Sequence, residues 1–385
     1  MFLRFHDILS PVIVTIRGDS MLFDPRPKTK REDLFDREKE LETLQSGDAP
    51  MILILAPRRY GKTSLLNVFL NEIPDPHIFI DCRALIVEET SKEVFYRFMT
   101  NEINRIARSD KNILKWIERI KGIKIFGFEV SFAEYEKSPP NLGEIMKVIN
   151  DWSVNSSIKT LLVFDEAQLL RFFRRRGGID FVDLFSYIYD NLEGIRIILT
   201  GSEVGILKDF LGINEVDSPM YGRYISEINL SKFSKDMSLE FLLEGFKQIG
   251  MEPTPLILEK AVDALDGVVG WLVMFGNKAV ERKRVDDEIL NEVLSEAKLV
   301  VKNELEQLFK NSEKYRYILK ALSYGANTWS SIKEAVEFYE GRKITDASFT
   351  RILNRLISMG YVNVRYGEKK IYEISDPIVA KVVKE

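Results

Sequence analysis

The chain has 385 residues, of which 45% are hydrophobic and 30% are charged, and its formal net charge is -4. This composition is typical of a folded protein of about two or three domains, and it excludes a disordered chain. It also excludes a basic field over the whole molecule, so any nucleic-acid site has to be local. The single cysteine, Cys82, cannot form an internal disulfide, and no apolar run approaches the length of a membrane span. We therefore expect a cytoplasmic protein without membrane contact.

The first segment, residues 1–31, has a mixed composition. Its last eight residues hold two prolines and four basic residues, which favours an extended N-terminal arm or linker. We expect a helix to begin after Asp36, because acidic residues fill the turn that follows it.

Between residues 32 and 230, short apolar runs alternate with helical patterns. The runs lie at residues 51–55, 77–80, 160–164 and 196–199. Runs of this length are typical of strands that are buried on both faces of a parallel sheet. Polar residues follow them, at the carboxyl ends of the predicted strands, where α/β folds bind their ligands. We therefore predict an α/β core with a parallel sheet and helices on both faces.

The first run leads into a segment typical of a P-loop. Its residues are Ala56, Pro57, Arg58, Arg59, Tyr60, Gly61, Lys62 and Thr63, and a helical pattern continues from Ser64. In such a strand–turn–helix unit, backbone N–H groups and the positive end of the helix bind phosphate. Lys62 would contact the outer phosphates of ATP or ADP, and Thr63 would bind Mg2+. Residues 57–64 are thus the predicted nucleotide site. Ala56 replaces the usual first glycine, and a positive φ there would be strained.

The run at residues 160–164 leads into Asp165 and Glu166. In P-loop proteins an aspartate at such a strand end holds magnesium, and we expect Asp165 to do so. The adjacent Glu166 would act as a general base towards the attacking water. Gln168 would either orient Glu166 or cap a turn.

Thr200 and Ser202 follow the run at residues 196–199. Either hydroxyl could contact the γ-phosphate or the attacking water, and ordinary turn chemistry is the alternative. Arg223 would stabilise the charge on the transferring phosphoryl group, and a surface ion pair is its alternative. We predict that Lys62, Glu166, Thr200 and Arg223 are the catalytic residues.

The rest of the chain predicts a helical region at residues 231–310 and a third unit at residues 311–385, in which helices precede two short strands. From Gly341 to Lys370, seven basic and two acidic residues leave an excess of five positive charges. Such charge suits DNA contact, and a protein-interaction module is the alternative. The residues predicted to contact DNA are Arg351, Arg355, Lys369 and Lys370. A second basic cluster consists of Arg171, Arg174, Arg175 and Arg176. A solvated face is favoured for it, and a nucleic-acid or partner contact is the alternative.

Several of these segments together resemble the archaeal ATPase family of the AAA-plus/STAND class of P-loop NTPases. The resemblance rests on residues 35–38, 57–63, 164–168, 199–202 and 218–223. It implies an ATPase core (residues 32–230), a helical lid (231–310) and a C-terminal winged helix (311–385). It also implies that Phe35 and Arg37 line the adenine pocket. The lid element at Gly270 lacks the proline that the family carries.

These observations lead to an expected function. The chain is predicted to be an ATP-binding, ATP-hydrolysing switch or motor that requires Mg2+ and contacts DNA or a protein partner through its winged helix. The alternative is a DNA-binding regulator or adaptor that holds nucleotide with little turnover. A nucleotide-dependent oligomer is compatible with either function.

Overall fold

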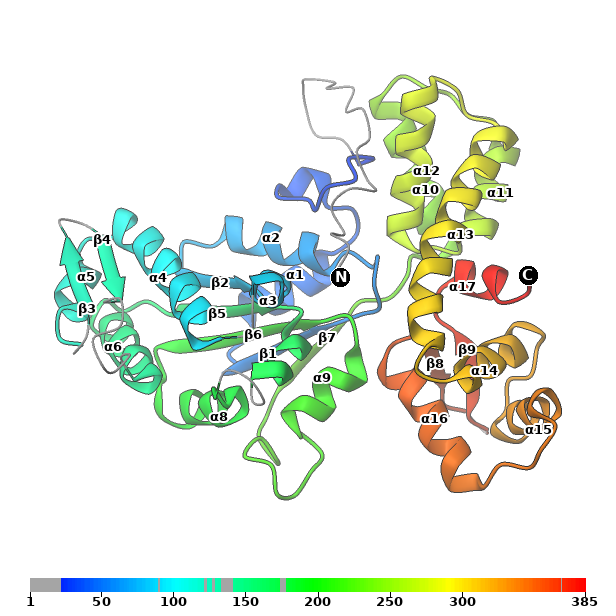
Figure 1. Cartoon of the computed structure of the whole chain (residues 1–385). Coiled ribbons are helices and arrows are strands. Elements are labelled where there is room, and N and C mark those ends of the chain that lie inside the picture. The colour runs from blue at the N-terminus through cyan, green and yellow to red at the C-terminus, as the bar shows by residue number, and fades with distance from the viewer. Residues whose placement is uncertain are drawn as a thin grey trace.

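The structure is a computed structural model, and it describes residues 22–88, 91–120, 123–126, 129–132, 141–173, 178–367 and 369–385. Roughly the first three-fifths of the chain form an α/β core, and the remaining two-fifths form two helical units beside it (Figure 1). Arg174, Arg175 and Arg176 lie outside the described residues, and so do residues 1–21 of the N-terminal arm.

The core contains a five-stranded sheet in the order β2-β5-β6-β1-β7, with every neighbouring pair parallel. Its strands are β1 (Met51–Leu55), β2 (His77–Asp81), β5 (Thr160–Asp165), β6 (Ile195–Gly201) and β7 (Ser226–Asn229). Apart from the edge strands β2 and β7, these strands are buried almost throughout, as their apolar runs predict. A separate antiparallel hairpin consists of β3 (Ile123–Phe126) and β4 (Glu129–Phe132).

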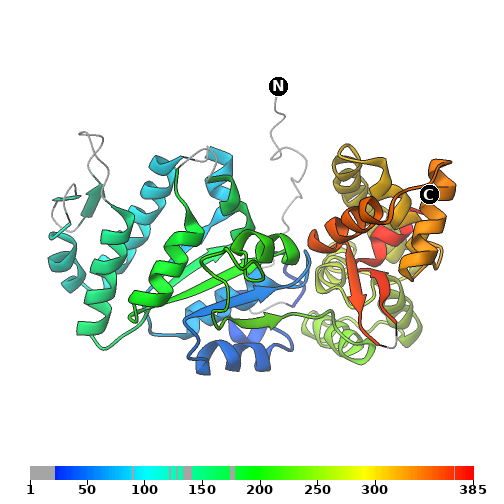
Figure 2. The ribbon, with the colours of Figure 1, turned by 90° about the horizontal axis from the view of Figure 1, so that it is seen from below.

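Helices cover both faces of the sheet, so the predicted fold class is confirmed (Figures 1 and 2). One face packs against α1 (Glu38–Ser46) and α2 (Lys62–Glu72). The opposite face is covered by α3 (Cys82–Glu88), α4 (Lys92–Ser109), α5 (Asn112–Ile117), α6 (Leu142–Asn155), α8 (Phe181–Asn191) and α9 (Val204–Leu211). Two short 3-10 helices, η1 (Arg31–Asp33) and η2 (Ala167–Phe172), complete the core.

The lid is made of four helices, α10 (Lys235–Gln248), α11 (Pro255–Leu265), α12 (Val269–Arg282) and α13 (Asp287–Phe309). The C-terminal unit contains α14 (Glu313–Ser323), α15 (Trp329–Glu340), α16 (Asp346–Ser358), β8 (Val362–Arg365), β9 (Ile371–Ile374) and α17 (Pro377–Val382). The strands β8 and β9 pair as an antiparallel ribbon, as the alternation of their residues predicts.

One hydrophobic cluster runs from the α1–α2 face of the sheet through the lid into the C-terminal unit. It includes Ile52 of β1, Phe275 of the lid and Leu353 of α16. A second cluster fills the opposite face of the sheet. Cys82, at the start of α3, belongs to this second cluster and is 1% exposed. The three units are therefore packed together rather than strung on open linkers.

Candidate nucleotide site

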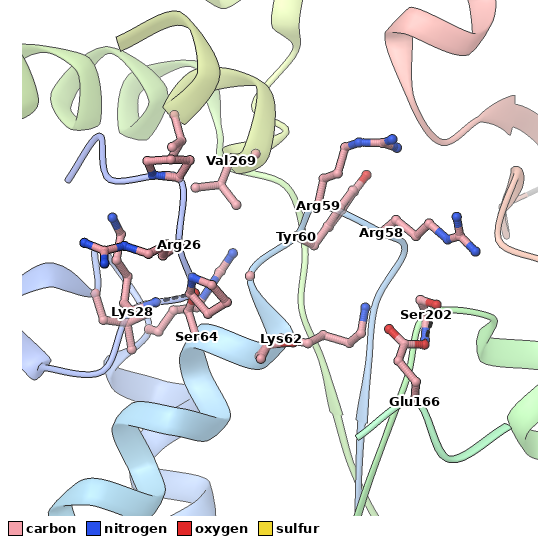
Figure 3. A pocket seen from close by; sticks show the side chains of 18 of the residues that line it. Arg26, Lys28, Arg58, Arg59, Tyr60, Lys62, Ser64, Glu166, Ser202 and Val269 are labelled. Atoms are coloured by element: carbon pink, nitrogen blue, oxygen red, sulfur yellow. Dashed lines mark hydrogen bonds between the residues drawn. The ribbon is translucent and has the colours of Figure 1, made fainter. Parts of the chain in front are cut away.

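A cavity of about 790 Å3 lies at the carboxyl ends of the strands, where the core meets the lid. It is lined by the phosphate loop, by the acidic strand end, by the start of α12, and by Leu22 and residues 24–28 (Figure 3). The predicted residues Phe35, Arg37, Arg58, Arg59, Tyr60, Gly61, Lys62, Thr63, Ser64 and Glu166 all line this cavity. Pro57, Asp165 and Thr200 lie next to it without lining it.

In the phosphate loop, positive φ angles occur at two positions, and neither of them is Ala56. Gly61 has φ +88° and Arg59 has φ +70°, whereas Ala56 has no positive φ and is 2% exposed. An alanine at the first position is therefore accommodated without the strain that a positive φ would cause. Arg59 instead adopts a left-handed conformation that few residues with a side chain adopt.

Lys62 extends across the floor of the cavity towards Glu166 (Figure 3). Its Nζ donates to the carbonyl oxygens of Ala56 at 2.8 Å and Pro57 at 3.1 Å. Burial lowers the pKa of Lys62, although Glu166 and Asp165 act in the opposite direction. The ammonium thus lies within the loop where phosphate oxygens would bind.

Asp165 is fully buried at the end of β5. Its Oδ2 accepts from Thr63 Oγ1 at 3.3 Å and from the Arg83 guanidinium at 3.1 Å, and its Oδ1 accepts a hydrogen bond from Thr200 Oγ1. Burial raises the pKa of Asp165, and the hydrogen bond from Thr200 acts against that rise. The hydroxyl of Thr63 and the carboxylate of Asp165 are hard oxygen donors, and a site with one or two protein ligands suits Mg2+.

Glu166 is held in place by a set of donors around one carboxylate oxygen. Its Oε2 accepts from Ser202 Oγ and Gln168 Nε2, both at 2.6 Å, and from the Ser202 backbone N–H at 3.1 Å. Its own φ of +56° turns the side chain into the cavity at the end of β5. Burial would raise the pKa of Glu166, but Lys62 and these hydrogen bonds outweigh it and lower the pKa. Of the two roles predicted for Gln168, it therefore orients Glu166.

The two hydroxyls after β6 differ in position. Thr200 is fully buried, where it donates to Asp165 and accepts from the backbone N–H of Glu166 at 3.1 Å. Ser202 lines the cavity beside Glu166. A direct contact to phosphate or water is therefore open to Ser202, whereas Thr200 is placed to fix the two acidic residues.

Arg83 is a site residue that sequence reasoning missed. It follows β2, lines the cavity and pairs with Asp165 at 3.1 Å and with Asp81 at 2.9 Å. Because Asp81 and Asp165 are register partners on adjacent strands, Arg83 bridges two strand ends. Its position three residues after the apolar run at residues 77–80 was the signal that could have identified it.

The other end of the cavity is aromatic. Phe35 packs edge-on against Phe233 and Phe241, each with ring centroids 5.5 Å apart. Arg37 is 5% exposed, donates to the Ser231 carbonyl at 3.0 Å and lies over the Phe233 ring. An apolar wall of this kind suits a purine ring, which is the role that the resemblance implies for Phe35 and Arg37.

The lid and the C-terminal unit contact the phosphate loop through Arg59. Its guanidinium lies 4.3 Å from the Trp271 ring, 2.6 Å from Glu304 and 3.7 Å from Asp376. Trp271 Nε1 in turn donates to Asp376 at 3.0 Å. Two further hydrogen bonds join the same parts, from Gly270 N to the Arg59 carbonyl at 2.9 Å and from Tyr60 to the Ser375 carbonyl at 3.1 Å.

Arg223 lies apart from the cavity. It forms a two-point ion pair with Asp190 on α8, with distances of 2.6 and 3.1 Å, and lies near the Tyr189 ring. The surface ion pair named as the alternative for this residue is thus present. Arg171, from the basic cluster, lines the cavity and contacts Glu203 at 3.5 Å.

The four residues predicted to contact DNA are exposed. Arg351 and Arg355 line a hollow that α16 forms with Asp209 of α9 and with Ser312, Lys314 and Tyr315 at the start of α14. Helices α9 and α16 pack closely here. A Cβ built on Gly205 of α9 would lie 2.5 Å from Ser358 Cα of α16. Within the counted basic window, Arg342 pairs with Glu340, Lys343 with Glu337 and Arg365 with Glu373. These acids lie just outside the window, so the local positive charge is smaller than the window alone indicates.

Two family models match the chain. An ATPase domain described as predominantly from Archaea matches residues 34–275, and the C-terminal winged helix-turn-helix domain of MCM proteins matches residues 310–375. No curated protein matches the chain. None of the helices in the described ranges is long and apolar enough to cross a membrane.

Solved structures also resemble the chain. A Walker-type ATPase of Pyrococcus abyssi is 37% identical, with a TM-score of 0.79 over 95% of this chain and 100% of that one. The ORC2 protein of Aeropyrum pernix, in ADPNP and ADP complexes, is 13% identical, with a TM-score of 0.56 over 94% of this chain and 96% of that one. At that identity the second likeness concerns the fold alone.

Proposed function

The chain belongs to the family of ATPase domains found predominantly in Archaea, and from this premise we propose that it is a magnesium-dependent ATPase that works as a switch or motor. Its winged helix would couple the nucleotide state to DNA or to a protein partner. The observation that carries this proposal is the meeting of Lys62 and Glu166 in one cavity, with Thr63 and Asp165 beside them. These residues supply a phosphate-binding cation, a base and a set of metal ligands.

Each of these side chains has a task in hydrolysis. Lys62 would leave the loop carbonyls and bind the outer phosphates, next to the N-terminus of α2. Glu166, kept ionised by its lowered pKa, would accept the proton of the attacking water. Thr63 and Asp165 would hold Mg2+, which neutralises phosphate charge when bound. Thr200 would hold Asp165 and the backbone of Glu166 in position through its two hydrogen bonds.

Glu166→Gln tests the catalytic assignment. The amide cannot accept the proton, so Mg2+-dependent ATP turnover should fall by about 10²–10⁴-fold while nucleotide binding is kept. Glu193→Gln, an exposed carboxylate before β6, should leave turnover unchanged. If the wild-type protein shows no turnover with or without DNA, and Glu166→Gln changes nothing, the alternative of a nucleotide-holding regulator or adaptor is the better one.

We further propose that Arg223 acts on the nucleotide of a neighbouring copy, since it does not line the cavity of its own chain. A mixing experiment tests this role. Glu166→Gln and Arg223→Ala should each be inactive, but their mixture should regain turnover, because some interfaces then combine an intact Glu166 with an intact Arg223. If Arg223→Ala alone keeps full turnover, Arg223 is only the partner of Asp190, and if both variants are inactive but mixing restores nothing, Arg223 does not act on a neighbouring copy.

The DNA contact is tested on α16. Arg351→Ala combined with Arg355→Ala should weaken binding to duplex DNA. The slope of the logarithm of the binding constant against the logarithm of the salt concentration should also become less steep by about two. Arg342→Ala, whose guanidinium is already paired with Glu340, is the matched control and should change binding little. Unchanged binding in the double variant would favour a protein partner.

A further inference from the structure

Residues 22–30, which we call the strap, connect the lid to the core. Phe23 is 1% exposed, and its ring lies in a slot between Gly245 of α10 and Gly276 of α12. A Cβ on either glycine would overlap this ring, so the slot exists only because both positions lack a side chain. Beside it, the backbone N–H of Leu22 donates to Gln248 at 2.9 Å. This end of the strap is thus built into the lid.

The other end of the strap is bonded to the helix of the phosphate loop. The backbone N–H of Lys28 donates to Ser64 Oγ at 3.0 Å (Figure 3). Asn71 Nδ2 donates to the Thr29 carbonyl at 2.9 Å. Ser64 and Asn71 both belong to α2. Between the two ends, Pro25 and Pro27 fix φ and limit the conformations of the strap.

The strap also lines the nucleotide cavity. Asp24, Arg26 and Lys28 are among its lining residues, and Lys28 Nζ donates to the Asp24 carbonyl at 2.7 Å. The Phe23 ring lies 5.8 Å from Phe241, which itself lies 5.5 Å from Phe35. An aromatic chain therefore leads from the slot in the lid to the predicted adenine wall.

We propose that Phe23 is a positioning residue for bound nucleotide. By filling the slot in the lid, Phe23 holds the strap in place as a wall of the cavity. The hydrogen bonds from the strap to α2 fix the strap relative to the phosphate loop. Nucleotide would leave only when the strap or the lid moves, so Phe23 sets how long it stays bound. This inference rests on the proposed nucleotide site.

Phe23→Ala in the full chain tests the inference, with a mant-labelled ADP and Mg2+ as the probe. Dissociation of mant-ADP, followed by chase with unlabelled ADP, should be about tenfold faster than in the wild type, which corresponds to about 1.4 kcal/mol. Trp152→Ala is the matched control. It removes another buried aromatic ring on α6, next to Ser153, which bonds to the first residue of β5 at the end of the sheet opposite the cavity. All rates are measured below the melting temperatures of the variants.

Gly276→Ala provides a second, independent variant. Its added Cβ fills the slot from the lid side, so it should accelerate dissociation of mant-ADP as Phe23→Ala does. When both substitutions are combined, the two effects should not add, because the ring that the new methyl group would displace is already gone.

The outcomes separate this inference from the function on which it rests. If the wild type binds mant-ADP but Phe23→Ala releases it at the wild-type rate, the inference is wrong and the nucleotide site stands. The inference is equally wrong if Trp152→Ala accelerates release as much as Phe23→Ala. If the wild type binds no mant-ADP at all, both the site and the inference fall.

Discussion

At the scale of single residues, the position of Ser202 decides how Glu166 behaves. The serine hydroxyl and backbone N–H both donate to the carboxylate, and together with Lys62 they keep the pKa of Glu166 low despite burial. The charged form of Glu166, the proposed base, is therefore favoured by residues that follow a different strand.

Ser202→Ala should move the acidic limb of the ATPase pH profile to higher pH. Loss of the hydroxyl raises the pKa of Glu166, and a general base is inactive once it is protonated, so activity is lost earlier as the pH falls. The measurement is kcat against pH, with Ser186→Ala on α8 as the control. An acidic limb that stays in place would mean that Glu166 does not limit turnover in that range.

Part of this site follows from the sequence, and part does not. Lys62, Thr63, Asp165 and Glu166 were predictable because they follow closely on apolar strands, so their meeting depends only on parallel pairing. The bond from Ser202 to Glu166 could not be assigned, since either Thr200 or Ser202 fits the same pattern. The contact of Arg59 with Glu304 joins residues 245 positions apart, and no local pattern carries it.

At the scale of elements, Glu337 joins α15 to the turn that precedes α16. The backbone N–H of Ile344 donates to it at 3.0 Å, and Lys343 and Lys333 pair with it at 2.9 and 3.3 Å. The hydrogen bond from Ile344 and the two lysines lower the pKa of Glu337 to about 2. This carboxylate thus fixes where α16 begins.

Glu337→Gln should lower the melting temperature at neutral pH. A carboxylate with a depressed pKa stabilises the fold above its unfolded pKa of about 4.3, and that stabilisation is lost as the pH falls towards 2. The difference in melting temperature from the wild type should therefore shrink over that range. Glu334→Gln, a carboxylate on the same helix, should show little difference at any pH.

Elements with a strong period were expected from the sequence: the helices α10 and α13 lie in the predicted helical region, and the ribbon β8–β9 follows helices in the third unit. The edge strand β7 was missed, because its sequence Ser-Glu-Ile-Asn alternates over only four residues and holds one buried side chain. The segment before residue 31 was predicted to be an extended arm. Residues 22–30 form neither helix nor strand, but they pack against both the core and the lid.

At the scale of the whole molecule, Arg59 is the point where the three units meet. It belongs to the phosphate loop, it stacks on Trp271 and pairs with Glu304 of the lid, and it approaches Asp376 before α17. Burial raises the pKa of Asp376, and Arg59 and Trp271 counteract that rise. Arg59 thus connects the phosphate loop directly to both the lid and the C-terminal unit.

Arg59→Ala should loosen the arrangement of the three units. Loss of the cation–π contact and the ion pairs should lower the free energy of unfolding by about 1–3 kcal/mol. It should also raise the radius of gyration measured by small-angle X-ray scattering. Arg58→Ala is a suitable control. It removes a charge near the same Glu304, at 3.7 Å, but from a side chain that is 60% exposed. An unchanged radius would show that the hydrophobic contacts alone hold the units together.

The buried Cys82 gives the folded chain a built-in chemical probe of local opening. Burial raises the pKa of its thiol well above the usual range, and only the thiolate attacks alkylating reagents. Since it is the single cysteine of the chain, alkylation reports only the exposure of this one buried thiol. The rate of alkylation with and without ATP would therefore show whether nucleotide changes how readily the packing around Cys82 opens.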